Sequence, residues 1–276
     1  MTDADLLIDL LMRKEKLVAM LAPSFPIVFS YPAIITMLKK LGMSYTAEVA
    51  VGATQTNEQL MKLITDHPSG VRYITSPCPT MVRLIRRQLP QYAHYLMPGV
   101  DSPMIATAKI VRDRYPGYRP VFIGPCFVKK IEAKEDAPEL NILVVTYSEL
   151  QRVLTHFGVT DSDIRPEDHF DIRASGGLTT LYALDGGLTQ SSGAADRLGK
   201  TAVKNVSGPQ KNMAALKEFD TDTSIRLLDI LNCDGGCIMG PGIQSKLTPE
   251  ERKRKILAYY VQQTLTNDID AAAPAR

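Results

Sequence analysis

The four cysteines of this 276-residue chain are the residues best suited to chemistry. Each lies within two residues of a proline or a glycine, after a short strand-like run. Thiolates are soft ligands, so four of them on tight turns indicate a metal or iron–sulfur site. The four residues are Cys78, Cys126, Cys233 and Cys237.

The spacing of these cysteines favours one kind of site. Cys233 and Cys237 form a single CxxxC pair, and the other two are isolated and distant. Structural zinc favours two paired CxxC knuckles, and a redox dithiol favours CxxC at a helix start. Buried structural thiols are a further alternative. A cubane [4Fe–4S] cluster needs four thiolates, which this set supplies.

Two glycines separate the paired cysteines. Gly235 and Gly236 can adopt positive φ and allow close approach of the backbone to a ligand, so we assign them to cofactor binding. We expect their N–H groups to point at the cluster sulfide and to stabilise its negative charge.

Composition and charge narrow the function classes. Hydrophobic residues make up 45% and charged residues 22%, which is ordinary for a globular protein of one large domain or two lobes. The net charge of +2 does not predict nucleic acid or an anionic membrane as the main partner. The first residues of the chain are acidic and lack the basic start of a secretory signal peptide. No apolar run is long enough to span a bilayer. We therefore expect a cytoplasmic protein with reduced thiols.

Strand and helix patterns alternate along the chain. This predicts an α/β fold with mostly parallel sheets, in two lobes that enclose a central iron–sulfur site. We place the lobes at about 17–119 and 120–265 of a single domain, followed by a disordered tail at 266–276. The predicted strands are 17–25, 45–51, 72–75, 120–123, 142–147, 202–206 and 225–231. The predicted helices are 4–16, 33–41, 57–65, 81–88, 102–115, 149–157, 212–218 and 249–265.

Three segments of the chain resemble the signature motifs of a known family. They read TSPCP at 75–79, GPCFVKKIEA at 124–133 and NCDGGCIMGPG at 232–242, and they resemble the motifs of the catalytic domain of iron-only ([FeFe]) hydrogenases. LAPSF at 21–25 and DSPM at 101–104 match two further segments in the family's order. The resemblance covers roughly residues 17–265.

The resemblance implies a fold, a cofactor and a reaction. The family fold is two α/β lobes around the H-cluster, a [4Fe–4S] cubane joined through one cysteine sulfur to a diiron unit carrying CO and cyanide. The reaction is the reversible reduction of protons to H2. By motif, Cys78, Cys126 and Cys233 would be cubane ligands, and Cys237 would be the bridging ligand.

The same resemblance implies roles for residues around the diiron unit. Lys129 would hold a cyanide by a charge-assisted hydrogen bond, and Glu132 would anchor its loop. For Lys129 the alternative is a solvated surface lysine, and for Ser102 a plain helix N-cap. The segment 182–187 resembles an aromatic and glycine wall, with a core aromatic as the alternative for Tyr182. The remaining matched positions are the wall residues Pro23 and Ser24 and the diiron-contacting loop residues Ser102 and Pro103.

The chain also departs from the family pattern. The position of the proton-relaying cysteine is Pro77, which has no ionisable group. In the segment that resembles the acidic proton path, 53–61, Glu58 is the only carboxylate. These departures resemble sensory members rather than high-turnover enzymes. The alternatives are a non-catalytic [4Fe–4S] protein for redox sensing or cluster assembly, and a metal-free interaction domain.

The resemblance further implies partners. The chain lacks the ferredoxin-like cysteines that precede the catalytic domain in many family members. We therefore expect an external ferredoxin-like or other iron–sulfur electron partner, a separate subunit, or a further N-terminal segment. We also expect hydrogenase maturation proteins that supply the diiron unit.

Overall fold

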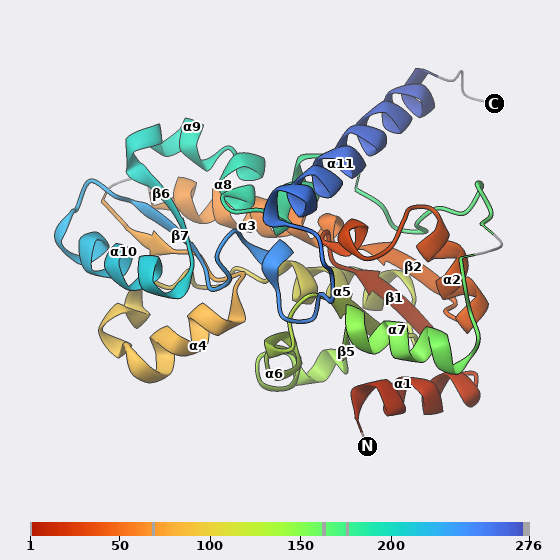
Figure 1. The fold of residues 1–276 in the computed structure, drawn as a ribbon. Coiled ribbons are helices and arrows are strands. Elements are labelled where there is room, and N and C mark those ends of the chain that lie inside the picture. Colours follow the sequence, from red (N-terminus) through yellow and green to blue (C-terminus); the bar gives the residue numbers. More distant parts are fainter. Residues whose placement is uncertain (1, 68–69, 162–163, 175–176, 273–276) are drawn as a thin grey trace.

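Two parallel β-sheets organise the chain. The computed structural model describes residues 2–67, 70–161, 164–174 and 177–272 (Figure 1). The first sheet has the strand order β2-β1-β4-β5, and the second has the order β3-β7-β6. The strands are β1 (Leu17–Leu21), β2 (Tyr45–Glu48), β3 (Tyr73–Ile74), β4 (Arg119–Gly124), β5 (Leu143–Thr146), β6 (Val203–Ser207) and β7 (Leu227–Leu231).

All pairings between these strands are parallel, which confirms the predicted fold class. Apolar runs explain the central strands, because a parallel strand covered on both faces is apolar throughout. Every residue of β1 and of β7 is buried. In the first sheet, Leu17 pairs with Arg119 of β4 and Leu21 with Ile123, so the carboxyl ends of these strands meet at one edge.

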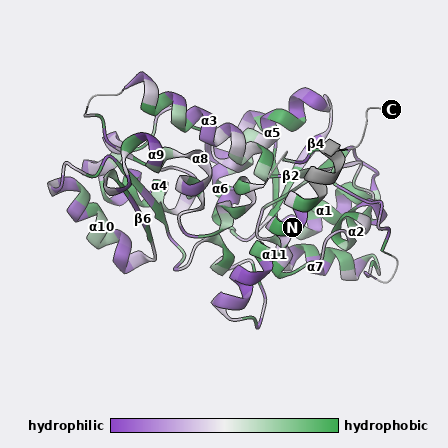
Figure 2. Ribbon diagram, turned by 90° about the horizontal axis from the view of Figure 1, so that it is seen from above, coloured by the Kyte–Doolittle hydropathy of each residue, from purple (hydrophilic) through white to green (hydrophobic). Residues whose placement is uncertain are grey.

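Amphipathic helices cover both sheets. In Figure 2 the strands are mostly green, whereas the surrounding helices carry both green and purple segments. The first sheet and its helices form the largest buried cluster, and a second cluster around Ile74, Ile85 and Phe219 joins α4 and α10 to β7. The helices are α1 (Asp3–Met12), α2 (Ala33–Leu41), α3 (Ala50–Asp66), α4 (Pro79–Gln88), α5 (Pro103–Arg114), α6 (Val128–Glu135), α7 (Tyr147–His156), α8 (Gly187–Ser192), α9 (Ala194–Leu198), α10 (Pro209–Thr221) and α11 (Pro249–Ala272).

The two sheets do not follow the predicted division near residue 120. Strands β4 and β5 lie after that point but join β1 and β2 in the first sheet. Strand β3 lies before it but joins the second sheet. The position of β4 between β1 and β5 buries its apolar residues, Val121 to Ile123. Side-chain packing, and not order along the chain, therefore decides that β4 lies next to β1.

Several element boundaries also differ from the prediction. The strand predicted for 17–25 ends at Leu21, and a 3-10 turn at Phe25–Ile27 follows it. Helix α3 begins at Ala50 rather than 57, because small residues in its first turns pack closely against α5. The predicted tail is helical as far as Ala272, and 273–276 lie outside the described residues. No helix within the described ranges is long and apolar enough to cross a membrane.

Candidate iron–sulfur centre

The four cysteines come from loops that follow strands of both sheets. Cys126 follows β4 of the first sheet, whereas Cys78 and Cys233 follow β3 and β7 of the second. Cys78 is the N-cap of α4, with Pro79 at the first helical position, and Cys237 opens a 3-10 turn at Cys237–Met239. Since parallel sheets present their ligand sites at the carboxyl ends of strands, this edge is a natural site. All four thiols are free and only partly exposed.

The thiols are close enough to influence one another. Burial is the main cause that raises the pKa of Cys237, and the other three cysteines raise it further. Burial likewise raises the pKa of Cys233 to about 11, again with contributions from Cys78 and Cys126. Coordination to iron would reverse this trend, because metal ions favour thiolates.

The donor set of the site is four cysteine thiols. Within the described residues, which include all four cysteines, no group of three or more His, Cys, Asp or Glu side chains is placed to hold one metal ion. A cubane would take one thiolate on each of its four irons, which is the number of soft ligands that this chain supplies.

The loop between Cys233 and Cys237 requires its glycines. Gly235 and Gly236 have φ values of +89° and +92°, which other residues rarely adopt. A Cβ on Gly236 would also lie 2.7 Å from the carbonyl oxygen of Ala183. The expectation that their N–H groups face the cluster is wrong. The Gly236 N–H donates to the Cys233 carbonyl at 2.9 Å, because the loop closes as a tight turn. The Gly235 N–H donates to Ser207 Oγ at 3.0 Å.

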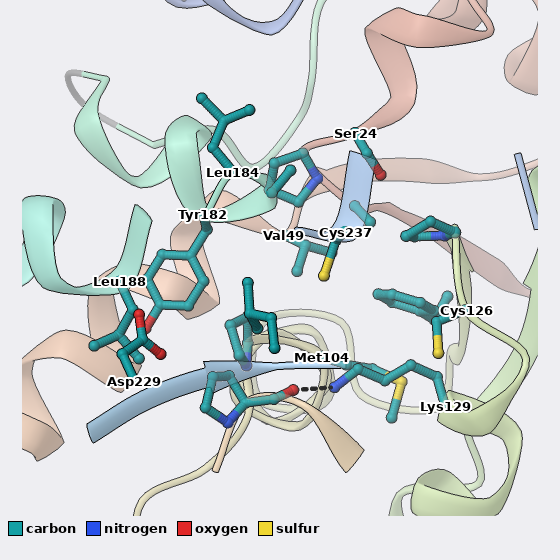
Figure 3. Close-up of a pocket in the computed structure, with 18 residues that line it drawn as sticks. Ser24, Val49, Met104, Cys126, Lys129, Tyr182, Leu184, Leu188, Asp229 and Cys237 are labelled. Carbon is teal, nitrogen blue, oxygen red and sulfur yellow. Dashed lines mark hydrogen bonds between the residues drawn. The ribbon is translucent and has the colours of Figure 1, made fainter. Parts of the chain in front are cut away.

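A largely apolar cavity of about 80 Å³ adjoins Cys126 and Cys237. In Figure 3 Cys237 lies between a side formed by Tyr182 and Asp229 and a side formed by Cys126 and Lys129. Other walls come from the loop after β1, from β7 and from the start of α5. The lining residues are Ala22, Pro23, Ser24, Val49, Pro77, Pro103, Met104, Phe122, Pro125, Cys126, Lys129, Tyr182, Ala183, Leu184, Leu188, Asp229, Leu231 and Cys237.

Most of the predicted wall residues lie in this cavity. Pro23, Ser24, Pro103 and Lys129 line it, whereas Ser102 does not. Ser102 is the N-cap of α5, and its Oγ accepts the N–H of Ile105 at 3.5 Å. Together with Glu132, Ser102 instead lines a separate polar cleft of about 510 Å³ between α4, α5 and α6.

Lys129 is buried, so it is not a solvated surface residue. Its Nζ donates to the Pro77 carbonyl at 3.2 Å, the dashed line in Figure 3. The same Nζ lies 2.6 Å from Glu132 Oε2. Glu132 is also buried and thus neutralises the lysine where water is excluded. An ammonium has three N–H groups, and among the described residues only the Pro77 carbonyl accepts a hydrogen bond from this one, so N–H groups remain for an acceptor in the cavity. A group with negatively polarised ligands fits beside Lys129.

The tertiary structure adds residues that the motifs did not indicate. The hydroxyl of Tyr147 donates to the Ala22 carbonyl at 2.9 Å and accepts from Ser24 Oγ at 2.9 Å, which fixes one cavity wall. Burial raises the pKa of Tyr147. Asp229 lies in the opposite wall and accepts the Thr75 hydroxyl at 2.7 Å. Its signal in the sequence was a single charged residue inside the apolar strand Leu227–Leu231.

The structure also places the two positions, Pro77 and Glu58, at which the chain departs from the family's proton-transfer pattern. Pro77 lines the cavity, so the wall has no ionisable side chain at that position. Glu58 lies on α3 and is exposed to solvent. The segment 53–61 therefore brings no carboxylate to the cavity.

The fold and the site define an H-cluster-type domain, and comparison with known proteins agrees. The family model described as "Iron only hydrogenase large subunit, C-terminal domain" matches residues 15–241. The chain therefore belongs to this family.

Solved structures of the family share the fold. HydA1 from Chlamydomonas reinhardtii, as a variant, superposes with a TM-score of 0.71 at 14% identity, covering 93% of this chain and 88% of that one. A structure of HydA(deltaEFG), reported for stepwise H-cluster assembly, gives a TM-score of 0.70 at 15% identity, covering 93% and 88%. None of the curated proteins compared by sequence matches the chain.

Proposed function

We propose that this chain binds a [4Fe–4S] cluster through Cys78, Cys126, Cys233 and Cys237, with a diiron unit carrying CO and cyanide in the adjoining cavity. When bound, that cofactor supplies the metal chemistry of reversible proton reduction to H2. One observation carries the proposal. Cys237 and the buried Lys129 face the same apolar cavity, at the edge where the cysteine loops of both sheets converge.

The protein residues have separable tasks in this proposal. The cysteines hold the cluster between the two sheets, and Lys129 orients a cyanide through a charge-assisted hydrogen bond. Glu132 holds the lysine ammonium in place, since the two charged groups lie 2.6 Å apart. The apolar walls exclude water from the reacting site.

We infer a slow or sensory hydrogenase rather than a fast one. Pro77 lines the cavity where a proton-relaying side chain would stand, and the one carboxylate of 53–61 faces solvent. Electrons would come from a separate ferredoxin-like or other iron–sulfur partner, and maturation proteins would deliver the diiron unit.

Anaerobic reconstitution tests the proposal in stages. Iron and sulfide are added first, then the diiron unit, and infrared spectra and H2 evolution with reduced viologen are recorded. We expect cubane absorbance, CO and cyanide stretching bands, and slow H2 formation. A cubane without those bands would overturn the proposal and support a non-catalytic [4Fe–4S] protein. No cluster absorbance would indicate a metal-free domain.

A further inference from the structure

Asp229 is a buried carboxyl group in the cavity wall with no task in the function proposed above. It occupies the middle of β7 and is only 3% exposed. The Thr75 hydroxyl donates to its Oδ1 at 2.7 Å, and the same hydroxyl accepts the Ile230 N–H at 3.3 Å. One carboxyl oxygen is thus fixed against β3, and the side chain lines the cavity opposite Lys129 (Figure 3).

The surroundings of Asp229 raise the pKa of its carboxyl group towards neutral pH, which suits proton exchange. Burial is the main cause that raises its pKa, to about 6, and the charge of Asp185 raises it further. The Thr75 hydroxyl opposes this shift, because it stabilises the carboxylate. A group with such a pKa is populated in both protonation states near neutral pH, as proton transfer requires.

The other titratable side chains of the wall are less suited to this task, leaving aside the cysteines assigned to the cluster. Lys129 is held by its ion pair with Glu132. Burial and the charge of Asp229 raise the pKa of Tyr182 well above its usual value. The Tyr182 hydroxyl already donates to Asn57 Oδ1 at 3.1 Å, away from the cavity.

A polar strip leads from Asp229 towards solvent. Asn205 of β6 is the register partner of Asp229. Its side chain lies against Gly186, where an added Cβ would be 3.3 Å from Asn205 Nδ2. The neighbouring Asp185 is exposed and accepts the Ser207 hydroxyl at 3.0 Å. The polar side chains of Asn205 and Ser207 on β6 thus lie beside the strand that carries Asp229, and the exposed Asp185 is hydrogen-bonded to one of them.

We propose that Asp229 carries protons between solvent and the cavity in this chain, in place of a side chain at position 77. The inference rests on the proposed function. In each transfer the O–H bond of the protonated carboxyl breaks, and the proton passes to an acceptor bound in the cavity. The carboxylate then takes a proton from hydronium or from the acid form of the buffer on the Asp185 side, which leaves water or the buffer base, and no electron passes through it.

The test compares Asp229→Asn with Glu58→Gln in the cofactor-loaded protein. Asparagine keeps an oxygen that can accept from Thr75 but cannot titrate, and Glu58 is an exposed carboxylate of α3. We expect D229N to keep its iron content and its CO and cyanide bands while H2 evolution falls at least ~100-fold, the usual range for losing a proton-transfer group. We expect E58Q to evolve H2 at the wild-type rate.

A second readout does not depend on activity. In pH-difference infrared spectra, we expect a buried carboxyl C=O band in the wild type that titrates near pH 6 and is absent from D229N. Thr75→Val should move this titration to higher pH, because the carboxylate loses its hydrogen bond. The T75V titration also tests the inference if D229N fails to bind the cofactor.

The outcomes separate the inference from the function. CO and cyanide bands with full H2 evolution in D229N would overturn the inference alone. Difference spectra in which D229N keeps every carboxyl band that titrates between pH 5 and 8 in the wild type would also overturn it. Loss of H2 evolution in E58Q but not in D229N would assign the proton route to 53–61 instead. Absence of CO and cyanide bands from the wild type would overturn the proposed function itself.

Discussion

Cys233 and Cys237 belong to one loop but have different surroundings. Cys237 lines the cavity, whereas Cys233 does not and lies two residues after the end of β7. Their neighbour Asp234 is exposed and pairs with Lys211 at 2.8 Å. This difference agrees with the proposal that Cys233 binds the cubane alone and that Cys237 also faces the diiron unit.

Replacement of Cys233 tests the ligand assignment. We expect Cys233→Ala to abolish cubane absorbance after reconstitution, because one iron loses its thiolate. Asp234→Asn, one residue further along, should retain the full cluster signal, since its carboxylate forms only a surface ion pair. A C233A protein with the wild-type iron content would show that the assignment is wrong.

Glu48 is another buried acid, and its side chain does not line the cavity. It ends β2, accepts the Tyr259 hydroxyl at 3.0 Å and accepts the Ala174 N–H at 3.3 Å. Burial is the main cause that raises its pKa from 4.5 to about 7, although both hydrogen bonds and Arg173 oppose the shift. The folded state therefore holds this proton to higher pH than the unfolded state does.

This pKa predicts how stability depends on pH. Because the pKa of Glu48 is raised on folding, its contribution to the free energy of unfolding is complete below pH 4.5 and is lost as pH rises through about 7. Between pH 6 and 8, we expect the wild type to lose about 1 kcal/mol from this group. Glu48→Gln should remove that loss in urea titrations at the two pH values. The exposed variant Glu58→Gln should behave as the wild type, and an unchanged pH dependence in E48Q would contradict the prediction.

At the scale of elements, α4 and α6 connect the two sheets at the site. Each follows a candidate ligand, Cys78 or Cys126. The arginines of α4 pair with acids at the end of α6. The pairs are Arg83–Glu135 at 3.0 Å, Arg83–Asp136 at 3.2 Å, Arg86–Asp136 at 3.3 Å and Arg87–Glu135 at 3.2 Å.

The exposure of each arginine decides how much its ion pairs contribute to stability. The side chain of Arg83 is 12% exposed, against 65% for Arg87, so water screens its charge less. We expect Arg83→Met to lower the free energy of unfolding by about 1 kcal/mol, and Arg87→Met by less than about 0.5 kcal/mol. Urea denaturation at low and high salt checks this, since the effect of R83M should shrink as salt rises. Equal effects of the two variants would contradict the ranking.

At the scale of the whole molecule, the proposed cluster joins two sheets that otherwise have separate cores. Cys126 belongs to the first sheet, and Cys78 and Cys233 belong to the second. A ligand that binds only the folded arrangement stabilises it by mass action. Cluster binding should therefore stabilise the whole chain and not only its loops.

Thermal unfolding under anaerobic conditions measures this coupling. We expect the reconstituted protein to unfold at least ~5 °C above the apoprotein, because tight metal binding contributes several kcal/mol to folding. Removal of iron with a chelator should return the transition to the apoprotein value. C233A should show no increase on reconstitution, and an increase of the same size in that variant would mean that the stabilisation has another source.

The sequence determined the class of fold, the family and the residues available for the site. Apolar strand runs alternating with amphipathic helices are local patterns, so the parallel α/β class was predictable. The cysteine motifs are also local, which is why Cys126, Lys129 and Cys237 could be named in advance.

Only the tertiary structure decided which strands share a sheet, and it placed β4 beside β1 against the predicted division. In the folded chain the N–H groups of Gly235 and Gly236 donate to protein acceptors and not towards the cluster site, and Ser102 lies outside the cavity. Strand order and wall composition depend on contacts between residues far apart in the chain, which no local pattern contains. For the same reason Asp229 looked like an isolated charge in an apolar strand, until folding placed it opposite Lys129 in the cavity.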